Sequence, residues 1–259
     1  MSPQSLLLTS LPSPSLLDLV DCYWLYLDNR DPIHVVLPDG TVDVVIQIDN
    51  QSAQSWVYGT TTTRTELSIA QDCHYLGIRF RPGQSRHFMT ASARELTDSY
   101  ESTQGLLKFS LEEIPEHLER GTITHHLDRI LTDHLATGFT NYPSLDQVIQ
   151  LIEARRGCLR IDEAVDSFGQ SRRQLERLFL ETVGVSAKKF ATIIRLQHAT
   201  QLISSPSRLP LSLVAAELGY TDQSHMAHDF KRLIGLSPTE FSQDLGVFLQ
   251  DPRLSSSAH

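Results

Sequence analysis

The stretch Val214–Phe241, VAAELGYTDQSHMAHDFKRLIGLSPTEF, decides the fold of the C-terminal part of this chain. It repeats the pattern of Ile161–Phe190, IDEAVDSFGQSRRQLERLFLETVGVSAKKF, which lies about 51 residues earlier. Each copy has a short apolar helix pattern, a glycine, a polar capping turn and a second helix pattern that stops at another glycine. A tight turn between two crossing helices needs a residue that tolerates positive φ, and glycine does. The repeat therefore predicts two helix-turn-helix units, at 161–184 and 211–235.

One long helix is predicted between the two units. Apolar residues recur at helical spacing from Ser186 to Ser204, a segment that spans about 27 Å at 1.5 Å per residue. We therefore expect residues 141–259 to form an all-α C-terminal domain in which a long helix joins two helix-turn-helix units.

The first part of the chain has the residue pattern of strands and turns. β-branched segments at Val35–Leu37 and Thr41–Ile48 flank a Pro-Asp-Gly turn, and Tyr75–Phe80 is a further strand pattern closed by Pro-Gly. From about Ser85 the pattern becomes helical. The sequence thus predicts an α+β chain whose residues 1–140 form a small β-rich domain with a helical extension.

The charge of the chain is unevenly distributed. The 259 residues carry a net charge of −9, which by itself argues against a nucleic-acid partner. However, residues 1–154 hold 9 Lys and Arg against 20 Asp and Glu, whereas residues 155–245 hold 12 against 10. The acidic balance belongs to the N-terminal part alone, and such asymmetry is typical of a nucleic-acid module joined to another domain.

The region Asp162–Phe241 resembles the DNA-binding domain of the arabinose-regulator (AraC/XylS) family of bacterial transcription factors. In the second unit, the resemblance rests on the Gly-aromatic-x-Asp-Gln-Ser turn, the Phe-Lys pair and the Gly-x-Ser-Pro motif that ends the helix. Earlier in the chain, it rests on the segments SRRQLERLF and RLQHATQLI. LPDGTVDVVIQI and GIRFRPG resemble, more loosely, a small β-domain that precedes this module in other members. The chain departs from the family pattern at Leu180, Met226 and His228.

The resemblance implies a transcription regulator, such as an activator, that binds double-stranded DNA in the cytoplasm and has RNA polymerase as a further partner. The second helix of each unit would enter the major groove and meet base edges with its outward residues. Helical spacing, with the apolar positions fixed on the core side, selects these outward residues. The DNA-binding candidates are Arg172, Arg173, Gln174 and Arg177 in the first unit, and Gln223, Ser224, His225, His228, Lys231 and Arg232 in the second.

Three residues of the β-rich part are candidates for a ligand pocket. Trp24 and Tyr26 lie in an aromatic segment, and His34 precedes the Pro-Asp-Gly turn. Core packing of the aromatic residues and a solvent-facing histidine are the alternatives. Two hypotheses for the domain therefore stay open: it senses a small-molecule effector, or it serves only dimerisation or protein interaction.

Enzymatic function is not expected. No nucleophile elbow, P-loop or dinucleotide fingerprint occurs, and no catalytic residue, cofactor or metal site is predicted. Cys22, Cys73 and Cys158 fit neither a disulfide framework nor a zinc ribbon, and they suit a reducing cytoplasm. No apolar run is long enough for a membrane helix. We expect a cytoplasmic monomer or homodimer.

Overall fold

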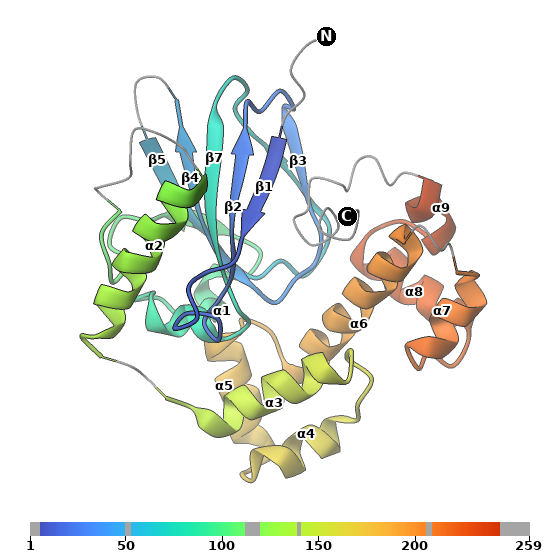
Figure 1. Ribbon diagram of the computed structural model, residues 1–259. Helices are drawn as coiled ribbons and strands as arrows, with labels where there is room; N and C mark the ends of the chain where they lie inside the picture. The colour runs from blue at the N-terminus through green and yellow to red at the C-terminus, as the bar shows by residue number, and fades with distance from the viewer. Residues whose placement is uncertain (1–5, 50–52, 112–119, 139–140, 206–208, 244–259) are drawn as a thin grey trace.

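A computed structural model describes residues 6–49, 53–111, 120–138, 141–205 and 209–243. It shows a β-rich N-terminal part followed by a helical C-terminal part, so the predicted α+β class is confirmed (Figure 1). Among these residues, no helix combines the length and the apolar composition that crossing a bilayer requires.

Six strands form one antiparallel sheet in the order β1-β2-β7-β4-β5-β8. The strands are β1 (Leu6–Ser10), β2 (Val20–Leu27), β4 (Val42–Ile48), β5 (Ala53–Tyr58), β7 (His74–Phe80) and β8 (Tyr100–Ser102). A second, two-stranded sheet pairs β3 (Ile33–Val36) with β6 (Thr65–Ser68). The Pro38–Gly40 turn therefore joins two different sheets and does not close a hairpin.

The helices follow the predicted organisation. The helical segments are η1 (Gln84–His87), α1 (Ala93–Leu96), α2 (Arg120–Leu135), α3 (Pro143–Ala154), α4 (Ile161–Phe168), α5 (Arg172–Thr182), α6 (Ala187–Ser204), α7 (Leu211–Glu217), α8 (Gln223–Leu233) and α9 (Pro238–Gln243). The long helix between the two units is α6, and its N-cap Ser186 accepts a hydrogen bond from the Lys189 backbone N–H at 3.2 Å.

The N-terminal core lies on one face of the six-stranded sheet. Because side chains alternate across a strand, Leu76, Ile78 and Phe80 of β7 point to the same face and are buried there. Helix α2 covers this face with Ile123 and Leu127, among others, and it lies beside the sheet in Figure 1. The helices from α3 onward pack into two other clusters, one for each helix-turn-helix unit. The domain boundary at residues 140 and 141 stays a prediction.

The N-terminal domain is docked on the first unit through the turn between α5 and α6. The Thr60 hydroxyl donates to the carbonyl of Val183 at 2.6 Å, and the Thr97 hydroxyl donates to the carbonyl of Gly184 at 2.9 Å. Gly40 lies directly against the ring of Phe190, a fully buried residue of α6. Only a residue without a side chain allows the backbone to come this close.

The same domain also contacts the second unit. Val35 and Leu37 are buried in the hydrophobic cluster of α7, α8 and α9. The backbone N–H of Arg64 donates to the carbonyl of Leu233 at 2.7 Å, at the end of α8. The two units are therefore held by one N-terminal body as well as by α6.

The docking contact at Gly40 can be tested by adding one methyl group. A Cβ at Gly40 would lie 2.3 Å from Cε2 of Phe190, so either the ring or the turn must move. We expect Gly40→Ala to lower the free energy of unfolding by about 1–3 kcal/mol, as overpacking does. The matched control is Gly138→Ala, because nothing lies within 4 Å of that position. Urea unfolding measures both, and equal stabilities of the two variants would contradict the contact.

A buried histidine predicts a loss of stability in acid. Burial first, and then the charges of Arg86, Lys108 and His134, lower the pKa of His87 to about 4. The unfolded chain therefore takes up a proton near pH 6.5, whereas the folded chain does so only near pH 4. Stability is full above pH 6.5 and should decline by up to about 3 kcal/mol as the pH falls towards 4.

Urea unfolding at pH 7, 6 and 5 measures this decline. His87→Gln removes the titrating group and should flatten it, whereas the exposed His228→Gln should keep it. Equal pH slopes for wild type and His87→Gln would assign the acid sensitivity to other groups.

Candidate nucleic-acid interface and pocket

The first unit is an α4–turn–α5 motif with both ends of the turn capped. Gly169 ends α4 in the left-handed conformation with φ of 70°. Ser171 then caps α5 by accepting a hydrogen bond from the Gln174 N–H at 3.3 Å. The core side of α5 is buried, and the predicted outward residues are all exposed. These residues are Arg172, Arg173, Gln174 and Arg177.

The second unit repeats this geometry. Gly219 has φ of 64° after α7, and the Asp222 carboxylate caps α8 by accepting from the His225 N–H at 2.8 Å. Met226, which departs from the family pattern, is fully buried in the core. The six residues predicted to face DNA are exposed. They are Gln223, Ser224, His225, His228, Lys231 and Arg232.

Ion pairs occupy most of the cations on the outward face of α5. Arg172 Nε lies 3.3 Å from Glu176 Oε1, and an Arg177 guanidinium nitrogen lies 3.0 Å from Glu181. Exposed i, i+4 pairs of this kind contribute only a few tenths of a kcal/mol, so phosphate can replace the carboxylate at little cost. Arg173 forms no ion pair with any residue that the structure describes.

The cations of α8 lie near its C-terminal end. Lys231 Nζ is 3.7 Å from Glu240 of α9, and an Arg232 nitrogen is 2.6 Å from the buried carboxylate of Asp229. The N-terminal half of the exposed face of α8 is instead lined by uncharged polar and imidazole groups. The two units therefore present chemically different faces.

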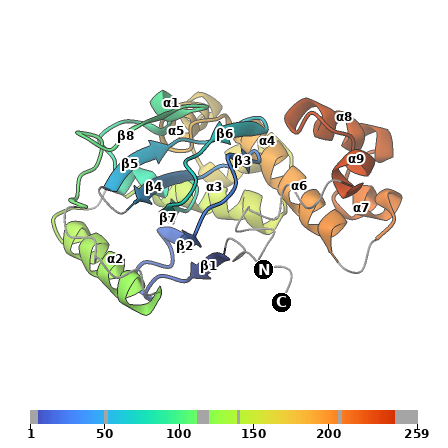
Figure 2. The same cartoon turned by 90° about the horizontal axis from the view of Figure 1, so that it is seen from above.

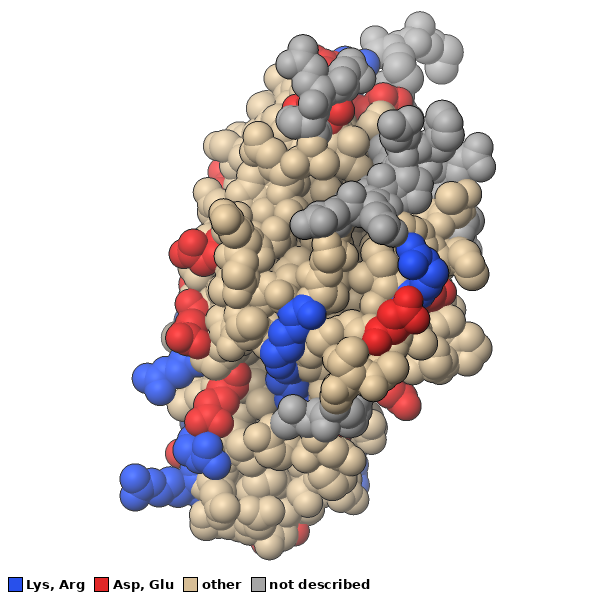
Figure 3. All heavy atoms as spheres, turned by 90° about the vertical axis from the view of Figure 1, so that its left-hand side faces the viewer, with Lys and Arg blue, Asp and Glu red and all other residues tan. Residues whose placement is uncertain are grey.

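Helix α6 separates the two candidate reading helices. Its first half, with Phe190 and Ile194, belongs to the cluster of α5, whereas its second half, with Ala199 and Ile203, belongs to the cluster of α8. Figures 1 and 2 accordingly show α5 and α8 near opposite ends of α6. Basic side chains project at the lower end of the molecule in Figure 3, the end at which α3, α4 and α5 lie in Figure 1.

A pocket lies on the other face of the six-stranded sheet. Its volume is about 190 Å³, and its second wall is the two-stranded β3–β6 sheet. The sheet wall follows the alternation of the strands, because Trp24 and Tyr26 of β2, and Tyr75 and Arg79 of β7, point away from the core. Gly77 makes room between them, since a Cβ there would lie 1.9 Å from the indole of Trp24.

The polar groups of the pocket are centred on a buried ion pair. Arg79 Nε donates to both carboxylate oxygens of Asp43, at 3.0 and 3.2 Å. The Trp24 indole N–H donates to the same carboxylate at 3.1 Å. The Thr41 hydroxyl bridges Asp43 and Asp39, at 3.3 and 3.0 Å. The two aspartates are thereby fixed at the end of the pocket that adjoins the docked helices.

The structure brings the three predicted pocket residues, Trp24, Tyr26 and His34, to one cavity. Their binding of a ligand stays a prediction. Sequence reasoning missed Asp43 and Arg79, although the alternating segment HYLGIRF puts Arg79 on the same strand face as Tyr75.

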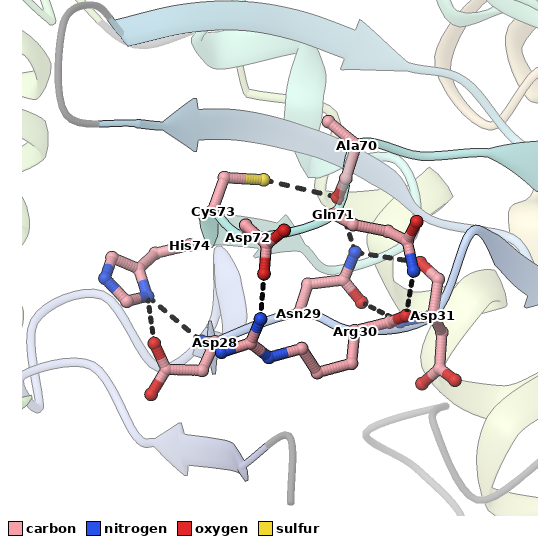
Figure 4. A network of polar contacts seen from close by, with 9 residues as sticks. All are labelled: Asp28, Asn29, Arg30, Asp31, Ala70, Gln71, Asp72, Cys73 and His74. Carbon is pink, nitrogen blue, oxygen red and sulfur yellow. Dashed lines mark hydrogen bonds and ion pairs between the residues drawn. The ribbon is translucent and has the colours of Figure 1, made fainter. Parts of the chain in front are cut away.

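A polar network joins the β2–β3 and β6–β7 loops (Figure 4). The Asn29 side-chain amide donates to the carbonyl of Ala70 at 2.5 Å, and Arg30 forms an ion pair with Asp72. Cys73 Sγ donates to the same Ala70 carbonyl at 3.3 Å, and burial raises the pKa of the thiol. A raised thiol pKa disfavours the reactive thiolate, so Cys73 is part of the scaffold. Within the described part of the chain, no three or more His, Cys, Asp or Glu side chains lie close enough together to bind a metal ion.

Known proteins match the two parts of the chain separately. Residues 164–244 match a helix-turn-helix domain family, and residues 8–102 match a domain of unknown function, DUF6597. The transcriptional regulator GbdR of Pseudomonas aeruginosa is 30% identical over 105 residues, which are 40% of this chain and 28% of GbdR. The arabinose operon regulatory protein of Escherichia coli is 32% identical over 71 residues, which are 27% of this chain and 24% of that protein.

The matched segments thus span about a quarter of the length of these relatives. The crystal structure of ToxT from Vibrio cholerae O395 covers 89% of this chain and 98% of its own, with a TM-score of 0.46 and 10% identity. The helix-turn-helix match and the curated relatives agree with the resemblance carried by the tandem repeat. Residues 164–244 of this chain therefore carry a helix-turn-helix domain that is similar to part of the arabinose operon regulatory protein.

Proposed function

We propose that the chain is a sequence-specific DNA-binding transcription regulator that reads two successive major-groove segments with α5 and α8. The observation that carries the proposal is the pair of capped helices, each with its polar face exposed, near the two ends of α6. Helix-turn-helix readers on one face of B-DNA must lie about one helical turn, roughly 34 Å, apart. The 18 residues of α6 give this helix a length of about 27 Å. Each reading helix is offset from the end of α6 near which it lies, and these offsets add to the distance between α5 and α8.

The contacts divide into base readers and phosphate binders. Arg173 and Gln174 lie in the first turn of α5, the part of a reading helix that meets base edges. Arginine pairs with guanine and glutamine with adenine through two hydrogen bonds each. Lys231 and Arg232 lie in the last turn of α8 and meet phosphate, which fixes register without reading sequence. The remaining candidates flank these positions, namely Arg172, Arg177, Gln223, Ser224, His225 and His228.

The pocket supports control of this DNA binding by a small molecule. The segments that line its inner end are also the segments that hold the helical domain. Asp39 lines the pocket next to Gly40, which contacts Phe190, and Thr61 lines it next to Thr60, which binds Val183. An occupant that shifts these segments would change how the two units are held, which couples the two sites. A domain used only for dimerisation or protein interaction is the alternative, and it leaves the pocket without a role.

As a regulator of this kind, the chain would act in the cytoplasm as a monomer or homodimer, with double-stranded DNA and RNA polymerase as partners. The net charge of −11 on residues 1–154 repels DNA phosphate and would orient the N-terminal domain away from the duplex.

Footprinting of the purified full chain on genomic fragments tests the proposal. We expect one subunit to protect about two helical turns of DNA, read as two boxes about ten base pairs apart. Inserting half a helical turn, about five base pairs, between the boxes should abolish joint protection, because the docked domain and α6 fix the spacing. Protection of a single box, or indifference to the insertion, would show that the two units do not read DNA together.

Substitutions separate sequence reading from charge. Arg173→Ala should cost about 1–3 kcal/mol of binding free energy and relax the preference at one base pair. Lys231→Ala should weaken all sequences alike and reduce the salt slope by about one unit. Arg160→Ala is the control, since Arg160 is an exposed cation at the start of α4, outside both reading helices. Binding curves at several salt concentrations measure these effects, and a changed base preference in Lys231→Ala would refute the division.

A further inference from the structure

We propose that the pocket of the N-terminal domain binds a small organic cation, an amine attached to an apolar body about the size of one aromatic ring and a short chain. This inference rests on the proposed function only in taking the pocket to be the effector site. Charge, wall chemistry and volume each support it separately.

The charge of the pocket lining favours a cation. Three carboxylates line the cavity, those of Asp39, Asp43 and Asp98, whereas Arg79 supplies the one guanidinium among the described lining residues. Arg79 is paired with Asp43, and Asp98 adds a further negative charge to the lining. Apolar walls strengthen this field, because they lower the local dielectric constant. An anionic ligand would be repelled, and a cationic ligand attracted.

Asp98 is positioned to meet the cation. Its carboxylate accepts hydrogen bonds from the Thr62 backbone N–H at 2.7 Å and from the Thr62 hydroxyl at 2.8 Å, so it stays ordered although it is exposed. Its backbone has φ of 55°, a conformation that Asp and Asn tolerate better than other side chains. The carboxylate thus sits at the solvent-facing rim of the pocket, where a ligand ammonium group can keep part of its hydration.

Two tyrosine side chains line the same pocket as this carboxylate. Tyr58 and Tyr100 are paired across β5 and β8, and their rings stack with centroids 5.0 Å apart. Burial, and then the neighbouring Tyr100, raise the pKa of Tyr58 to about 12, so the ring stays a neutral phenol at pH 7. The negatively charged face of such a ring attracts an ammonium group. Two tyrosine rings and a carboxylate in the lining of one pocket are the groups that attract an organic cation.

The rest of the pocket accommodates an apolar body. Val36 and Leu67 of the β3–β6 sheet, and Leu7 and Val45 of the six-stranded sheet, supply apolar side chains to the lining. The volume of about 190 Å³ exceeds the roughly 150 Å³ of a cavity known to take up benzene, so a ring with a two-carbon chain fits.

The test compares three probes of matched shape with the full chain at pH 7. The probes are 2-phenylethylamine, which is cationic, 2-phenylethanol, which is neutral, and 3-phenylpropionate, which is anionic. Isothermal titration calorimetry should show the amine binding about tenfold more tightly than the alcohol, with the acid not binding. Binding of the acid more tightly than the amine would overturn the proposal, and so would equal binding of amine and alcohol or no binding of any probe.

A pair of substitutions locates the cation. Asp98→Asn keeps an acceptor for the Thr62 backbone N–H and tolerates the backbone conformation, but it removes the charge. It should weaken the amine about tenfold and leave the alcohol unchanged. Glu101→Gln is the matched control, because it removes an equal charge from β8 at an exposed position that does not line the pocket. Equal losses in both variants would mean that long-range charge, and not the proposed subsite, attracts the amine.

The ligand-free footprint is measured in parallel. A normal footprint together with failed amine binding overturns the ligand class alone. Lost footprinting with intact amine binding overturns the DNA-reading function and leaves the pocket assignment standing.

Discussion

The close approach of the Gly40 backbone to the ring of Phe190 is the contact on which the arrangement of the whole molecule depends. Phe190 is buried in the core of the first unit and lies near the start of α6, the helix that carries the second unit. A turn of the N-terminal domain pressed against this ring therefore fixes the position of α6 relative to the sheet. The hydrogen bonds of Thr60 and Thr97 to the α5–α6 turn then fix its rotation. Both candidate reading helices take their placement from this junction.

The two faces of the six-stranded sheet have opposite chemistry because strand residues alternate. On β4, Val44 and Ile46 point into the core, whereas Asp43 and Val45 line the pocket. A buried ion pair such as that of Asp43 and Arg79 seldom adds stability compared with apolar residues of similar size. Its presence is better explained by the cavity it faces than by the stability of the sheet. One sheet thus serves as scaffold on one side and as a chemically specific wall on the other.

The sequence predicted the helical domain well because its determinants are local. The turns and helix caps are set through contacts within a few residues, by Gly169, Ser171, Gly219 and Asp222. Because the pattern occurs twice, the two copies can be compared within the one sequence. Trp24 and its neighbours could also be proposed for a pocket, since an aromatic segment signals either a core or a binding wall.

Other features depend on contacts between distant parts of the chain. Strand pairing in the β-domain joins segments far apart in sequence, so neither the sheet order nor the separate β3–β6 sheet could be deduced. Asp43 looks like an ordinary solvent-facing residue of a half-buried strand until its partner Arg79, 36 residues later, is placed beside it. The docking of the two domains could not be predicted from the sequence. An apolar residue in a strand pattern, such as Val35, is expected to pack in the core of its own domain, whereas it packs in the core of the second unit.

The burial of Val35 and Leu37 in the core of the second unit bears on how such proteins recombine. A DNA-binding module that completes its own core can be joined to any sensor through a linker. Here the N-terminal domain supplies two apolar side chains to the helical domain, so exchanging either domain uncovers an apolar face on the other. A chimera that grafts residues 141–259 onto a foreign sensor would need compensating polar residues on that face, and the two parts of this chain are expected to have diverged together.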